Sequence, residues 1–142
     1  CSGYVFGPVA GFMVGAITPL VSNFFLGQGP WTPYQMLAWG LAGVSAAYVR
    51  RFHLNRIGLV IFGILWGYLY GWIIDVWFWS SFVYPLTLKT FIVAQLNSAW
   101  FDSLHAMGNA IFLGFFGEKT IAILERFKKR FSWDYQCPAE PL

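Results

Sequence analysis

Long uncharged segments constrain this chain more than any other feature of its sequence. Four stretches are apolar enough to cross a hydrocarbon core, which needs about 20 residues of helix. We expect them at about residues 4–26, 35–49, 57–79 and 90–124. Only 11% of the 142 residues are charged, less than half of the roughly 25% in soluble domains. The sequence therefore predicts an all-α fold, an integral membrane helical bundle with four transmembrane segments.

Two of these segments have unusual lengths. The second is short, whereas the fourth would reach roughly 50 Å at about 1.5 Å per residue. The fourth must therefore tilt strongly, protrude, or begin with a separate outer helix up to about Ala99. We expect residues 1–131 to form the bundle. Residues 132–142, with Pro138 and Pro141, are expected to be a polar, loosely attached tail.

The distribution of Lys and Arg predicts the orientation, because cytoplasmic loops carry an excess of both. Arg50, Arg51 and Arg56 follow the second segment, and four basic residues follow the fourth. The stretches 27–33 and 80–89 together contain one basic residue, Lys89. We expect a multi-pass protein of the plasma membrane, with its basic ends and C-terminus in the cytoplasm. Topology accounts for the basic clusters, so no nucleic-acid partner is expected.

Small residues recur at every fourth position in each segment, which places each row on one helix face. Such rows let helix backbones approach closely in lipid. Either all the rows build the bundle or one is left for the helices of a partner. The rows are Gly7, Gly11 and Gly15; Ala38, Ala42 and Ala46; Gly63, Gly67 and Gly71; and Ala106, Ala110 and Gly114.

The connection between the first two segments is unusually apolar. Residues 23–36 hold four aromatic rings, two glycines and two prolines but no charge, and the glycines and prolines break a helix. One interpretation is a lid or wall over a small-molecule pocket. The other is a tight interfacial turn whose Trp31 and Tyr34 lie among the lipid headgroups.

Polar residues are rare at membrane depth, and most of them lie in the fourth segment. Asn97, His105 and Asn109 are expected to share a face that Asp102 borders, and Asp75 lies near the outer end of the third segment. With Trp72, Trp77 and Trp79, they predict a polar patch with aromatic walls below the outer loops. Because polar residues within a membrane span are energetically costly, we take them as candidates for a functional site.

Three interpretations of this patch remain open. Asp102 pairs with His105 and the amides satisfy each other; or the patch orients a ligand; or Asp102 orients His105 as a general base. The third lacks a recognisable nucleophile motif. No His or Cys residues have the spacing of a metal site. The second histidine, His53, lies at the opposite membrane face, and the two cysteines are far apart. We therefore expect no metal, no cofactor and no catalytic residue.

Two stretches resemble a known family. The sequence FGPVAGFMVGAITPLVSNFFLGQGPWTPYQMLAWGLAG and the later FDSLHAMGNAIFLGFFG are similar to the substrate-binding S-components of energy-coupling factor (ECF) transporters. The resemblance covers roughly residues 4–130. It implies six membrane helices, of which the first two would precede Cys1. We therefore expect this chain to be part of a longer protein.

The resemblance also implies a function. Such a subunit captures a vitamin-like micronutrient from outside and docks on a transmembrane coupling subunit driven by two cytoplasmic ATPases. The first expectation for the ligand is a cobalamin-like corrinoid, followed by a flavin or another vitamin. The alternatives are an integral membrane enzyme and a purely structural subunit. The expected substrate-binding residues are Asn23, Gln28, Trp31, Gln35, Asp75, Trp79, Asn97, Asp102, His105 and Asn109.

Overall fold

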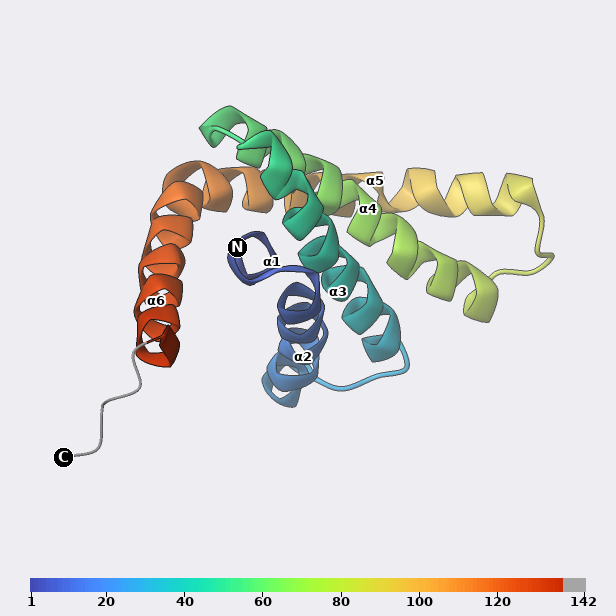
Figure 1. Ribbon diagram of the computed structural model, residues 1–142. Helices are drawn as coiled ribbons and strands as arrows, with labels where there is room; N and C mark the ends of the chain where they lie inside the picture. Colours follow the sequence, from blue (N-terminus) through green and yellow to red (C-terminus); the bar gives the residue numbers. More distant parts are fainter. Residues whose placement is uncertain (137–142) are drawn as a thin grey trace.

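The chain folds into helices joined by short connections (Figure 1). The computed structural model describes residues 1–136, and this range contains no β-strand. Two short turns of other helix types interrupt it, a 3₁₀ turn at Arg50–Phe52 and a π-helical turn at Leu113–Gly117. The α-helices of the described range are α1 (Ser2–Phe6), α2 (Pro8–Leu26), α3 (Thr32–Val49), α4 (Arg56–Phe82), α5 (Leu88–Phe112) and α6 (Glu118–Gln136). The expected all-α fold is confirmed.

Three helical stretches of the described residues are long and apolar enough to cross a membrane. They are α2, α4 and the continuous stretch Leu88–Phe131. The expected second span forms a helix where it was predicted, as α3, but it is not one of these three. Its first turn is polar and the rest is rich in alanine and glycine, which makes α3 less apolar than its neighbours.

The predicted first segment is divided into two helices at Gly7. This residue has φ 100°, a backbone conformation that glycine adopts readily, and Pro8 begins α2. The break interrupts the ladder of backbone hydrogen bonds. The carbonyl of Val5 instead accepts from Arg50 Nη1 at 3.2 Å and from Lys128 Nζ at 2.7 Å. These contacts attach α1 to the end of α3 and to α6.

Close backbone contacts join the helices in two pairs, α2 with α3 and α4 with α5. A Cβ atom added to Gly11 would meet the carbonyl of Gly43, and one added to Gly67 would meet the backbone of Ala106. Three of the four predicted rows of small residues thus lie partly or wholly in these two contacts. Gly7 does not belong to them, since nothing lies within 4 Å of a Cβ added there.

The fourth predicted segment is continuous past Ala99, so a separate outer helix ending there is wrong. Its N-terminus is fixed by a capping box in which Thr87 and Thr90 each accept from the other's backbone N–H. The π-helical turn then joins α5 to α6, which runs at a steep angle to α5 (Figure 1). Residues 132–136 of the expected loose tail belong to α6, and residues 137–142 lie outside the described range.

Candidate functional site

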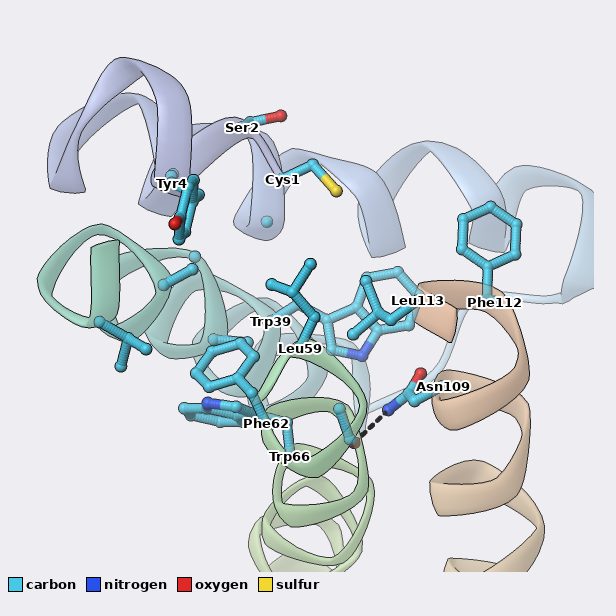
Figure 2. A pocket seen from close by; sticks show the side chains of 18 of the residues that line it. Cys1, Ser2, Tyr4, Trp39, Leu59, Phe62, Trp66, Asn109, Phe112 and Leu113 are labelled. Atoms are coloured by element: carbon cyan, nitrogen blue, oxygen red, sulfur yellow. Dashed lines mark hydrogen bonds between the residues drawn. The ribbon is translucent and has the colours of Figure 1, made fainter. Parts of the chain in front are cut away.

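A cavity of about 400 Å³ lies between the two helix pairs and is bordered by α1. Its walls are mainly aromatic and aliphatic. Figure 2 shows the side chains that surround it, among them Trp39, Phe62 and Trp66. The described residues that line the cavity include no Asp, Glu, Lys or Arg. The volume lies in the lower part of the range of about 300–1,000 Å³ that small-molecule sites occupy.

Tyr70 and His105 give this cavity a polar end. Their ring centroids are 5.1 Å apart, and both residues line the cavity. The hydroxyl oxygen of Tyr70 accepts a hydrogen bond from Gln35 Nε2 at 3.1 Å. His105 Nδ1 lies 3.1 Å from the carbonyl oxygen of Phe101. Because a carbonyl can only accept, Nδ1 carries a hydrogen and donates it to Phe101.

Asn109 is the second predicted site residue that lines the cavity. Its Nδ2 donates to the backbone carbonyl of Gly63 at 3.1 Å, the bond drawn as a dashed line in Figure 2. This bond holds the Asn109 side chain against α4. Of the ten predicted site residues, His105 and Asn109 alone are among the described residues that line this cavity.

Three other predicted residues meet beside the loop between α2 and α3. That loop is shorter than the predicted residues 23–36, because α2 continues to Leu26 and α3 begins at Thr32. The buried Asn23 donates from Nδ2 to Gln35 Oε1 at 2.8 Å and to Thr32 Oγ1 at 3.0 Å. The Thr32 hydroxyl donates to Gln28 Oε1 at 3.1 Å. We call these four residues, Asn23, Gln28, Thr32 and Gln35, the loop network.

The loop network reaches the cavity through the bond from Gln35 to Tyr70. The sequence interpretation did not include Thr32 or Tyr70. Tyr70 lies one residue before the glycine that ends the row in α4, and no motif marks it. Tyr70 is linked to the loop network by its hydrogen bond with Gln35, which lies 35 residues earlier in the chain. A contact over this distance cannot be read from the local sequence.

The two tryptophans of the prediction lie outside the cavity lining. Trp31 packs edge-on against Trp77, with ring centroids 5.7 Å apart. Trp79 donates from Nε1 to Thr90 Oγ1 at 3.0 Å and packs edge-on against Phe91. These contacts fix the ends of α3, α4 and α5 that lie farthest from Arg50, Arg51 and Arg56.

Asp75 and Asp102 meet at a serine on the contact between α4 and α5. Ser98 Oγ contacts Asp75 Oδ2 and lies 3.3 Å from Asp102 Oδ2. Asp102 is 3% exposed and Asp75 is 9% exposed. Neither a hydrogen bond nor an ion pair within 4.0 Å joins Asp102 to His105 among the described residues, so their pairing stays a prediction. Asp102 lies against Gly71, whereas the ring of His105 packs on Tyr70.

Asn97 is exposed and is not among the described residues that line the cavity. A step of eight residues turns a helix by about 80° beyond two full turns, so Asn97 is directed away from Asn109 and His105. Gln95, by contrast, has both polar atoms of its amide buried without a hydrogen-bond partner among the described residues.

The described residues contain no group of three or more His, Cys, Asp and Glu side chains that could hold a metal ion. No curated protein and no solved structure matched the chain. The model of one protein family, described as the substrate-specific component of ECF transporters, matches residues 2–124. This match spans most of the chain and includes every described residue that lines the cavity except Cys1. The chain therefore belongs to the family of ECF transporter substrate-specific components.

Proposed function

We propose that this chain captures a vitamin or related micronutrient for an ECF-type importer. The observation that carries the proposal is the cavity of about 400 Å³, which has a polar end and, apart from Cys1, is lined by described residues of the region that matches the family. Family membership implies a transmembrane coupling subunit and ATPase subunits as partners. We further propose that there are two ATPases and that both are cytoplasmic.

The proposed orientation has the basic ends of the helices in the cytoplasm. Arg50, Arg51 and Arg56 lie between α3 and α4, and the remaining basic cluster lies on α6. The loop network then faces outward. The cavity extends from Tyr70 toward Leu54 and Leu59, which lie close to the basic end. A ligand that arrives from outside therefore passes the loop network before it reaches the cavity.

In this proposal the bond between Gln35 and Tyr70 holds the outer side of the cavity closed. It joins α3 to α4, whereas the close backbone contacts lie within each helix pair. A bond between neutral side chains contributes only about 0.5–1.5 kcal/mol. Breaking it together with the ring contacts of Trp31 with Trp77 and of Trp39 with Tyr70 would let the two pairs separate while each pair remains packed.

The site residues proposed from the sequence fall into two groups under this mechanism. His105 and Asn109 would contact the ligand, and Asn23, Gln28 and Gln35 would hold the entrance. Trp31, Asp75, Trp79, Asn97 and Asp102 do not line the cavity and are proposed only as residues around it. A cobalamin-like ligand, the first expectation, would require a much larger space, so the cavity favours a smaller vitamin.

The enzyme alternative receives little support from the geometry. His105 bonds to the carbonyl of Phe101 and Asp102 lies against Ser98, so no hydrogen bond between the described side chains orients His105 through Asp102. The structural-subunit alternative predicts that no vitamin stabilises the purified protein. Ligand-dependent stabilisation in a thermal shift assay would exclude it.

Vitamin uptake tests the proposed function. The full-length gene is expressed with the coupling and ATPase subunits in auxotrophs for several vitamins, and growth is measured at limiting vitamin. We expect rescue for one vitamin and loss of rescue when the ATPases are inactive. Absence of rescue for every vitamin would contradict the proposal.

A further inference from the structure

The helix α6 carries a surface that is separate from the cavity. α6 lies at one edge of the molecule (Figure 1). It is held to the rest of the chain by Ile121, which lines the cavity, and by Lys128, which donates to the carbonyl of Val5. A step of five residues turns a helix by about 140° beyond one full turn, so Arg126 lies far around α6 from Ile121. The side of α6 that carries Arg126 is therefore directed away from the other helices.

Two arginines form a basic row on this outer side. Arg126 and Arg130 are four residues apart, so they lie on one face of α6, and both are exposed. Neither forms an ion pair with a described residue, and the neighbouring acidic residue, Glu125, lies 3.8 Å from Arg50 instead. The row is thus a positive charge that no described carboxylate neutralises.

An apolar row runs beside the arginines. Ile123, Phe127 and Phe131 follow one another at steps of four, and each is about half exposed or more. Ile123 is three residues before Arg126, and Phe127 is three residues before Arg130, so the two rows are neighbours. We call these five residues the basic–aromatic surface. A hollow on it is lined by Ile123, Arg126, Phe127, Lys129 and Arg130.

The length of the preceding helix places this surface beyond the hydrocarbon core. Residues 88–117, which form α5 and the π-helical turn, would reach about 45 Å at about 1.5 Å per residue, whereas the core is about 30 Å thick. α6 follows this stretch and leaves the axis of α5 at a steep angle (Figure 1). Exposed rings beside a basic row suit the membrane interface, where rings enter the acyl boundary and basic side chains reach the headgroups.

We propose that the basic–aromatic surface binds anionic phospholipids of the cytoplasmic leaflet. Arg126 and Arg130 donate to the lipid phosphates, because the guanidinium group matches a phosphate in charge and in geometry. Phe127 and Phe131 enter the acyl boundary beside them. A zwitterionic lipid has no net charge, so the arginines select anionic headgroups. The leaflet follows from the orientation proposed above, whereas the lipid preference does not depend on which ligand the cavity takes.

Lipid titration of the purified chain in a neutral detergent tests the charge selection. The melting temperature is measured while short-chain phosphatidylglycerol or short-chain phosphatidylcholine is added. We expect phosphatidylglycerol to raise the melting temperature and phosphatidylcholine to leave it unchanged. An equal effect of the two lipids would overturn the proposal, and so would the absence of any effect.

A matched pair of double variants locates the binding. Arg126→Gln combined with Arg130→Gln should raise the half-saturating phosphatidylglycerol concentration about 30-fold, because each basic residue near an anionic surface contributes about fivefold. Arg51→Gln combined with Lys119→Gln removes the same charge from exposed positions outside the hollow and should change that concentration far less. Equal changes in the two double variants would show attraction by net charge alone and would overturn the assigned site.

Spin labels test whether the apolar row enters the membrane. In a background without cysteine, a nitroxide is attached at Phe127→Cys or at Ala122→Cys, and the protein is reconstituted into nanodiscs that contain phosphatidylglycerol. Ala122 is exposed and lies about 140° around the helix from Phe127. We expect dissolved oxygen to relax the label at 127 and a water-soluble nickel complex to relax the label at 122. Relaxation of both labels by the nickel complex alone would overturn the proposed insertion.

A coupling subunit is the competing occupant of this surface, because family membership implies such a partner. Co-purification of the full-length protein with the coupling and ATPase subunits distinguishes the two. We expect the double variant at Arg126 and Arg130 to co-purify as fully as the parent protein. Loss of co-purification together with an unchanged response to phosphatidylglycerol would overturn the proposal and assign the surface to the coupling subunit.

Discussion

Lys128 Nζ lies 2.7 Å from the carbonyl oxygen of Val5, a residue 123 positions earlier in the chain. The bond exists because Gly7 interrupts the first helix and leaves that carbonyl free of its helical partner. It fastens α6 to α1, and Arg50 donates to the same oxygen from the end of α3. One backbone oxygen thus joins three helices at the basic end of the molecule.

Lys128→Met tests this junction. A hydrogen bond from a charged donor contributes about 1.5–3 kcal/mol, so we expect a lower melting temperature in detergent. Lys119→Met is the control on the same helix, because Lys119 is exposed. If both variants have the same melting temperature as the parent protein, the junction does not stabilise the fold.

The ion pair between Arg50 and Glu125 should contribute much less. Its two charged atoms are 3.8 Å apart and both side chains are more than 40% exposed, so we expect about 1 kcal/mol or less.

The contact between α4 and α5 predicts a sharp difference between two glycines. Gly67→Leu would place its side chain in the backbone of Ala106, so we expect the protein to misfold or to melt well below the parent. Gly108 faces open space in α5. Gly108→Ala should stabilise the helix by up to about 1 kcal/mol. Size-exclusion chromatography and thermal unfolding distinguish the two, and equal behaviour would mean that the helices do not pack through Gly67.

Two glutamines should respond in opposite directions to the same substitution. Gln95 has a buried amide without a partner, so Gln95→Met removes an uncompensated polar group and should raise the melting temperature. Gln35 bonds to both Asn23 and Tyr70, so Gln35→Met should lower it. A melting temperature for Gln95→Met below that of the parent would indicate that this amide has a partner in the membrane.

The proposed orientation predicts opposite labelling of two exposed positions. Cys1 and Cys137 are first replaced by Ser, and one cysteine is then placed at Ser81 or at Arg51. A maleimide that does not cross membranes should label Ser81→Cys in intact cells and Arg51→Cys only after permeabilisation. The reverse pattern would invert the proposed topology.

Secondary structure and membrane character followed from the sequence because they depend on local composition. The apolar segments and rows of small residues predicted helices and two of their close contacts, as at Gly11 and Gly67. The break at Gly7 was not predicted, although the pair Gly7–Pro8 is a recognisable signal for a helix start. The π-helical turn has no such signal in its sequence, LGFFG.

The candidate site was harder to predict because it depends on contacts between distant residues. Asp102 and His105 are close in sequence, yet helix geometry directs them to different partners. Gln35 and Tyr70 are far apart in sequence, and only the packing of α3 on α4 brings them together. The loop network combined three predicted residues with Thr32, whose hydroxyl could not be assigned a partner from its position alone.

The division into two helix pairs also bears on how such a protein can change its ligand over evolution. Within each pair, a larger residue at Gly11 or Gly67 would collide with backbone, so these positions tolerate little variation. Trp39 and Trp66 line the cavity, and Trp39 meets Gly15 of α2 through its backbone carbonyl. Substitutions there can reshape the cavity while the scaffold stays intact. Single substitutions at these positions can therefore change ligand specificity while the protein still folds.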